Sequence, residues 1–282
     1  MTVMISDLFV SDDRRTEELK KFFLLTPCRS LDEVKVIISG HSHAHAIARA
    51  LVTKPEINDM VDPRRLGQTH GLAGLLGGHF TPECRRLVVE LAQTRDIALS
   101  WRGNQHNGDF LLMPDRPLDF VPRSYPDKTV LSGAQVVPEA AIREHFQPSM
   151  DELAGILKEL GQAPGRRHLV LGTPAPMHNE AEIRRRLGRE PAFASRASSL
   201  GLDVATIGIT PASVRRKLWY VIQEMMAETA ASHGAAFVPS PPGSLDAESF
   251  LRLDMSGGDI THANERYGRL MLGQIAKLLN KA

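Results

Sequence analysis

The sequence is poor in cysteine, with only Cys28 and Cys84 in 282 residues. The two are far apart, which excludes the close cysteine spacing of zinc and redox sites and argues against a disulfide framework. The N-terminal stretch MTVMISDLFVSDDRR also lacks the basic start and long apolar run of a signal peptide. We therefore expect a cytoplasmic protein.

Positive and negative residues are nearly equal in number: 34 Lys and Arg residues and 33 Asp and Glu residues give a net charge of +1. This balance gives no support for binding to nucleic acid or to a membrane surface. No apolar segment has the length needed to span a bilayer. The local basic run Arg184-Arg185-Arg186 is typical of the solvated face of a helix.

Apolar, β-rich segments alternate with helical patterns along the chain, which is long enough to bury a sizeable core. Four segments have the composition of strands: residues 34–40, 95–104, 166–176 and 234–242. Helical patterns separate these segments from one another and follow the last of them. This alternation predicts a parallel sheet covered by helices on both faces, a flavodoxin-like three-layer α/β/α architecture. Ligands of such sheets bind at the carboxyl ends of the strands.

Two regions do not follow the alternation of strands and helices. Residues 1–33 precede the first strand and are expected to form an N-terminal extension. Residues 109–147 are rich in Pro, Asp and Arg, which predicts an insertion over one end of the sheet. The remainder of 34–282 is expected to form one domain.

The strand-end loops carry the residue types of nucleophilic catalysis. A serine, Ser42, follows the first strand, Asn104 follows another, and Asp259 and His262 precede the last helix. A nucleophilic serine needs a base, a group that orients the base, and donors for the developing oxyanion. On spacing alone the simpler interpretation is that Asp259 caps the helix and His262 lies at the surface.

The order of these short motifs resembles that of the SGNH (GDSL-type) hydrolase superfamily. GHS at 40–42 stands where that family has G-D-S, RGNQH at 102–106 stands for the G-x-N-D block, and DITH at 259–262 matches D-x-x-H. The Tyr-Gly pair in the following helix is also similar to the family's ending. The resemblance runs from about residue 34 to the C-terminus.

The resemblance implies a role for each matching residue. Ser42 would be the nucleophile, His262 the general base, and Asp259 the carboxylate that orients the base. The oxyanion hole would comprise the Asn104 amide, the backbone N–H of Ser42 and the backbone of Gly78. Several glycines lie before the helix that starts at Pro82, and Gly78 is the one we choose.

The sequence departs from the family's motifs at two aspartates. His41 replaces the aspartate of G-D-S, and Gln105 with His106 replaces the aspartate after the asparagine, which indicates a divergent branch. His41, His106 and Arg102 are candidates for the wall of a substrate pocket, although Arg102 fits a salt bridge equally well. The loop 172–176 with the two residues after it, Met177 and His178, also predicts a pocket wall, or simply a strand that ends at proline.

The histidine-rich stretch 41–45, H-S-H-A-H, raises the possibility of a metal site. His70, His79 and His106 lie in loops that could approach it. Against a metal, alternate residues diverge on a helix, and no H-E-x-x-H or cysteine–histidine spacing is present. We therefore expect no metal. We expect the histidines to line a polar pocket or to cap loop backbones.

The fold and the resemblance together imply a serine esterase or a carbohydrate O-deacylase that needs no cofactor. Its substrate would be an ester of a small molecule or of a carbohydrate. An O-acyltransferase with the same acyl-enzyme, or a non-catalytic binding protein on the same scaffold, are the alternatives. The sequence does not indicate an oligomeric state.

Overall fold

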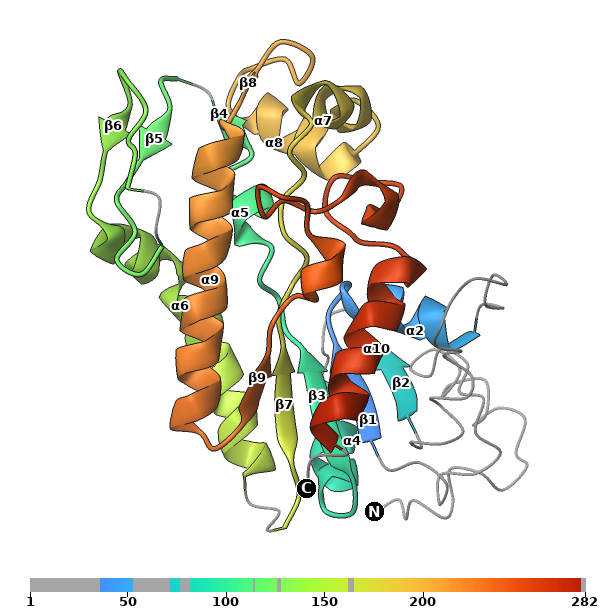
Figure 1. The fold of residues 1–282 in the computed structure, drawn as a ribbon. Coiled ribbons are helices and arrows are strands. Elements are labelled where there is room, and N and C mark those ends of the chain that lie inside the picture. Colours follow the sequence, from blue (N-terminus) through green and yellow to red (C-terminus); the bar gives the residue numbers. More distant parts are fainter. Residues whose placement is uncertain are drawn as a thin grey trace.

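The computed structural model describes residues 36–52, 72–76, 82–113, 115–125, 128–161 and 165–279 (Figure 1). The predicted N-terminal extension, 1–33, and Gly78 lie outside these ranges. The strands are β1 (Val36–Gly40), β2 (Leu72–Leu76), β3 (Asp96–Ser100), β4 (Leu112–Met113), β5 (Leu118–Asp119), β6 (Gln135–Val136), β7 (His168–Leu171), β8 (Gly208–Ile209) and β9 (Ala236–Val238). The helices are α2 (Ala44–Val52), α4 (Pro82–Ala92), α5 (Gln105–Gly108), α6 (Glu139–Leu160), α7 (Glu180–Leu187), α8 (Pro191–Ser199), α9 (Ala212–Ser232) and α10 (Glu265–Leu279). Two short 3₁₀ helices are η3 (Pro242–Ser244) and η4 (Leu253–Met255).

The central sheet is parallel and has the strand order β2-β1-β3-β7-β9. Four of its strands lie in the segments that the sequence predicts. The fifth, β2, has the sequence LAGLL and lies in a glycine-rich stretch without a strand pattern. It joins the sheet by pairing with β1 along its whole length. All five carboxyl ends therefore meet at one edge, where a ligand site is expected.

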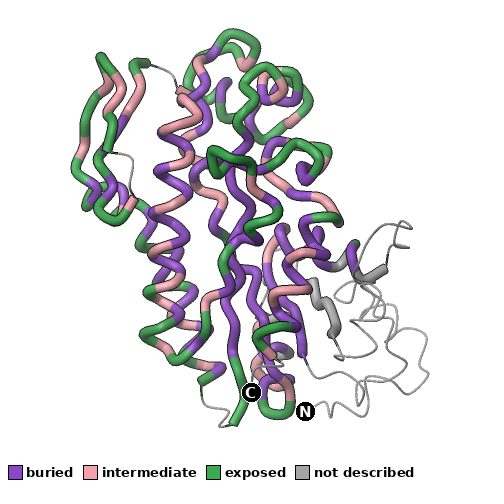
Figure 2. The backbone as a smooth tube through the Cα atoms, viewed as in Figure 1, coloured by how far each residue is buried: buried purple, intermediate pink, exposed green. Residues whose placement is uncertain are grey.

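The two faces of the sheet pack against different helices (Figure 2). Ile37 and Ile97 pack in a core with α4, α6 and α9, while their neighbours Ile38 and Ala98 pack with α2 and α10. This alternation is the period of two of a strand that is buried on both sides. The predicted three-layer α/β/α architecture is confirmed.

Helices α2 and α10 lie against each other on one face of the sheet (Figure 1). Their backbones touch at Gly268, where a Cβ atom would lie 2.1 Å from the carbonyl oxygen of Ala46. The neighbouring Tyr267 donates its hydroxyl to the Gly172 carbonyl at 3.1 Å, after the end of β7. This packing brings the loops that precede the two helices to the same edge of the sheet.

Residues 109–147 form short strands and the start of a long helix. β4 pairs with the distant β8, and β5 pairs with β6. Residue 147 is not a boundary between elements, because it lies within α6, which packs against α9. Asp119 in β5 accepts from Lys217 of α9 at 2.9 Å, and both side chains are almost fully buried. This ion pair anchors the β5–β6 segment to the main core.

Within the described ranges, no helix combines the length and the apolar character that a membrane crossing requires.

The contact at Gly268 yields a stability prediction. Gly268→Ala is expected to lower the free energy of unfolding by about 1–3 kcal/mol, because the added methyl group overlaps the Ala46 carbonyl and pushes the helices apart. Gly273→Ala in the same helix is the matched control: nothing lies within 4 Å of its added methyl group. The control should be neutral or more stable by up to about 1 kcal/mol. Urea denaturation of both variants measures the difference, and equal effects would contradict this account.

Candidate active site

The first strand ends in a turn that only glycine can form. Gly40 has φ +147°, and a Cβ atom there would lie 2.0 Å from the Ser100 carbonyl oxygen of β3. That same oxygen accepts from the His41 N–H at 2.9 Å. The chain then turns through Ser42, which is half-buried, and enters α2. Ser42 thus stands at the carboxyl edge of the sheet, at the start of a helix.

Asp259 and His262 form a hydrogen-bonded pair, so the interpretation of an unconnected cap and a surface histidine is wrong. Asp259 Oδ2 lies 2.8 Å from His262 Nδ1, and Asp259 Oδ1 accepts from the backbone N–H groups of Thr261 at 2.8 Å and His262 at 2.7 Å. Burial by itself would raise the pKa of Asp259, but these hydrogen bonds from His262 and Thr261 lower it well below its ordinary value.

The pairing also determines which nitrogen of His262 can act as a base. An ionised carboxylate only accepts hydrogen bonds, so Nδ1 is the nitrogen that donates to Asp259, and Nε2 is the nitrogen that can act as a base. Nε2 is buried and has no hydrogen-bond partner among the described residues. Ser42 is therefore not bonded to it in this structure. The two segments meet instead through His43, whose ring lies 5.4 Å from the His262 ring between centroids.

Asn104 lies in the loop after β3, at the N-terminus of α5. Its Oδ1 accepts from Asn107 Nδ2 at 3.1 Å. With the amide oxygen occupied in this way, the amide NH₂ is the end that remains to donate to a ligand.

A hydrogen-bond network of buried side chains supports the loop that contains Asn104. Gly103 has φ +81°, and its carbonyl accepts from the Thr173 hydroxyl at 2.9 Å. Gln223 donates to that hydroxyl at 2.9 Å and accepts from the Thr173 N–H at 3.1 Å. A Cβ atom at Gly103 would lie 2.6 Å from Thr173, so the loop fits only with glycine there.

Of three further histidines that the sequence places near the site, two are buried and one is exposed. His43 is 5% exposed and His106 is 1% exposed, whereas His45 is exposed. Burial, and then the proximity of His262, lowers the pKa of His43 to about 3. Burial, and then the proximity of His43 and Arg215, lowers the pKa of His106 to about 3. Both buried rings are therefore neutral at physiological pH and lie in one polar region.

The other candidates for a pocket wall have different surroundings. His41 is half-buried and packs edge-to-face on Trp101, with the ring centroids 4.9 Å apart. Arg102 forms an exposed ion pair with Glu152 of α6 at 2.9 Å, the alternative that the sequence left open. His70 and His79 lie outside the described residues. Among the residues that are described, no three His, Cys, Asp or Glu side chains converge as a metal site would require.

Two residues to which the sequence analysis gave no role at the site bind the segment 256–262. Arg186, at the end of α7, is 8% exposed and donates to the carbonyl oxygens of Gly257 at 2.7 Å and Asp259 at 2.6 Å. Glu190 accepts from the Ile260 N–H at 2.7 Å. The expectation of a wholly solvated basic run is therefore wrong for Arg186, because its helix is short and its last turn faces this loop. No sequence motif marks either residue.

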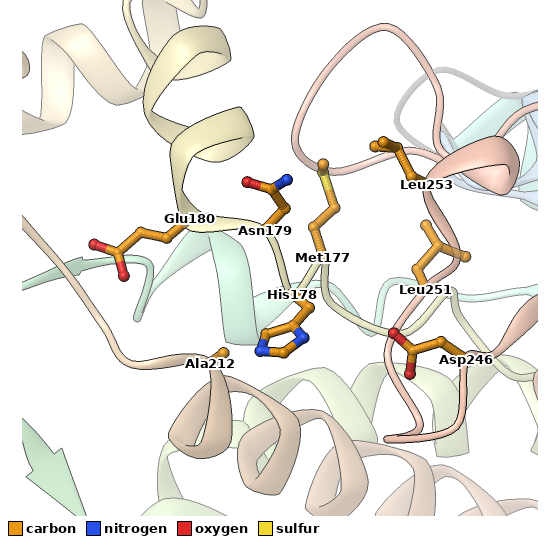
Figure 3. Close-up of a pocket in the computed structure, with 8 residues that line it drawn as sticks. All are labelled: Met177, His178, Asn179, Glu180, Ala212, Asp246, Leu251 and Leu253. Atoms are coloured by element: carbon orange, nitrogen blue, oxygen red, sulfur yellow. The ribbon is translucent and has the colours of Figure 1, made fainter.

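A pocket of about 530 Å³ lies beyond the loop after β7, and Met177 and His178 are in its wall (Figure 3). Leu251, Leu253 and Asp246 lie across from them (Figure 3). Asn179, Glu180 and Ala212 complete the lining. The sulfur of Met177 lies 3.7 Å from the Ser256 hydroxyl, so the pocket adjoins the loop that carries Asp259 and His262.

The neutral buried histidines yield a pH prediction. Each has an ordinary pKa of 6.5 and a folded pKa of about 3. Between these values the unfolded chain binds more protons than the folded chain, so the free energy of unfolding falls as the pH falls below about 6.5. Each histidine should contribute a slope of about 1.4 kcal/mol per pH unit.

Urea denaturation at several pH values between 5 and 8 tests this. His106→Asn should lose part of the pH dependence, whereas His145→Asn, at an exposed position, should retain it. An unchanged slope in His106→Asn would contradict the assignment.

Comparison with known proteins supports the fold at very low sequence identity. No family model and no curated protein matches the sequence. A Bacteroides fragilis structure described as an acylhydrolase aligns over 97% of both chains at 11% identity, with a TM-score of 0.51. A Streptococcus pneumoniae structure described as a platelet activating factor aligns over 93% of this chain and 92% of that one at 12% identity, with a TM-score of 0.50.

The likeness extends over nearly the whole length of this chain and of both structures. At such identities it establishes the fold alone. The chain therefore shares the three-layer α/β/α fold of these two structures, and the order of its strand-end motifs resembles that of the SGNH (GDSL-type) hydrolases.

Proposed function

We propose that the protein is a serine esterase or carbohydrate O-deacylase that acts through an acyl-enzyme. The observation that carries the proposal is the Asp259–His262 pair. It holds a protonated Nδ1 against the carboxylate and leaves Nε2 as a base beside the segment that contains Ser42. Similar structures include one described as an acylhydrolase, which agrees with ester chemistry.

In the proposed reaction, Ser42 Oγ attacks the ester carbonyl carbon while His262 Nε2 takes the hydroxyl proton. The Asp259 carboxylate stabilises the imidazolium that forms. The imidazolium then gives the proton to the leaving alcohol, and the acyl group stays on Ser42. A water molecule, deprotonated by His262, then attacks the acyl carbon. The bond from this carbon to Ser42 Oγ breaks, Oγ takes the proton back from His262, and the carboxylic acid is released.

The oxyanion of each tetrahedral intermediate would be bound by three donors. These are the Asn104 side-chain NH₂, the Ser42 N–H at the start of α2, and the Gly78 N–H. Free N–H groups at a helix N-terminus favour negative charge, which suits the position of Ser42. The pocket beside Met177 is large enough for the part of an ester substrate that does not react.

One observation favours a second candidate function, a non-catalytic binding protein: Ser42 does not hydrogen-bond to His262. In free enzymes such bonds are often long and tighten only when substrate binds. An acyltransferase would share every step up to the acyl-enzyme and differ in using an alcohol in place of water. Product analysis with and without added alcohols separates transfer from hydrolysis.

Reaction with a fluorophosphonate probe tests whether Ser42 is activated. We expect the native protein to be labelled, Ser42→Ala to lose labelling, and His262→Ala to label much more slowly because the base is gone. His145→Ala, which lies outside the proposed triad, should label at the native rate. A well-folded native protein that does not react would favour the binding-protein function.

Removal of the Asn104 amide tests the proposed oxyanion hole. Asn104→Ala should lower kcat for a p-nitrophenyl ester by about 10²–10³-fold, the usual effect of losing one oxyanion donor. Asn104→Asp is the matched variant, since it keeps the shape of the side chain but replaces the NH₂ donor with an oxygen. It should lose at least as much activity, and native kcat in Asn104→Asp would contradict the role.

A further inference from the structure

The segment between η4 and α10 that carries Asp259 and His262 has no regular secondary structure. Within it, the Gly257 N–H donates to the His262 carbonyl at 2.7 Å, and Ser256 forms an isolated bridge with Ala263. These bonds close the segment into a compact turn. They do not fix how the turn sits on the rest of the protein.

Arg186 supplies that attachment. One nitrogen of its guanidinium, Nη1, lies 2.8 Å from the Ser256 hydroxyl, 2.7 Å from the Gly257 carbonyl and 2.6 Å from the Asp259 carbonyl. Glu182, one helical turn earlier, accepts from Arg186 Nε at 2.6 Å and fixes the guanidinium plane. A single buried side chain therefore binds the start of the turn, at Ser256 and Gly257, and its middle, at Asp259.

Glu190 binds the same turn from the chain just beyond α7. Its Oε1 accepts from the N–H of Ile260, the residue after Asp259, at 2.7 Å. The single peptide group between Asp259 and Ile260 is thus bound at both its polar atoms, its carbonyl oxygen by Arg186 and its N–H by Glu190. Translation of the turn relative to α7 would break both contacts.

We propose that Arg186 is a positioning residue that sets the distance and angle of the Asp259–His262 pair relative to Ser42. The proposal rests on the proposed function, because it assigns Arg186 a role in the reaction rather than in folding alone. Arginine suits the task, since its rigid, planar group of donors can bind several oxygens at once, whereas lysine offers a point charge on a flexible stem. Arg186 does not touch the reacting atoms.

The test compares Arg186→Met and Arg186→Lys with Arg185→Met as the matched control. Arg185 is adjacent in the same helix and also pairs with Glu182, but its side chain is 53% exposed. Among the described residues, Glu182 is its ion-pair partner, and Arg185 makes no hydrogen bond to the turn. For p-nitrophenyl acetate hydrolysis, Arg186→Met should lower kcat by about 10–100-fold and leave KM within about threefold, since misplacement of about 1 Å has effects of this size. Arg186→Lys should recover part of the loss, and Arg185→Met should match the native protein.

A second readout follows the geometry directly. The proton on His262 Nδ1, shared with Asp259, gives a downfield NMR resonance that His262→Gln identifies by its disappearance. The resonance should be lost or broadened in Arg186→Met and retained in Arg185→Met. If Arg186→Met does not fold, Arg186→Lys carries the test by the same two readouts.

Native kcat and an unchanged resonance in a folded Arg186 variant would overturn the proposal, as would equal losses in Arg185→Met. If the native protein neither hydrolyses esters nor reacts with fluorophosphonate, the proposed function fails. The resonance then decides by itself whether Arg186 positions the pair.

Discussion

The arrangement of the site depends on the close contact between α2 and α10. The backbones meet at Gly268 and Ala46, where no side chain fits between them. Ser42 immediately precedes one of these helices and His262 the other, so the contact determines how near the two residues can come. Tyr267 adds a hydrogen bond to the end of β7 and ties α10 to the sheet edge. A pair of helices at ordinary spacing would carry the same residues but hold them farther apart.

The loops at this edge are supported by polar networks of residues that lie far away in the sequence. Gly103, which precedes the candidate oxyanion residue, is held by Thr173 and Gln223. The turn with Asp259 is held by Arg186 and Glu190. The supporting residues come from the loop after β7, from α9, from α7 and from the chain just beyond α7.

The electrostatics of the site combine one strongly ionised carboxylate with neutral imidazoles. Hydrogen bonds from His262 and Thr261 keep Asp259 charged despite its partial burial. Burial keeps His43 and His106 uncharged. A second positive charge beside His262 would oppose formation of the imidazolium that the proposed reaction needs. Neutral neighbours avoid that repulsion and still offer hydrogen bonds to a polar substrate.

The sequence by itself determined the three-layer fold and four of the five central strands, whereas the pairing of Asp259 with His262 was implied only by the resemblance to the SGNH motifs. The fold and these strands follow from a local signal, the apolar periodicity of the chain. Only the tertiary structure placed β2, which has no strand pattern and pairs because β1 offers a free edge. Only the tertiary structure brought Arg186 to the turn, because its partners lie 70 or more residues away and are mostly backbone oxygens. Such contacts depend on packing geometry and leave no pattern in the chain.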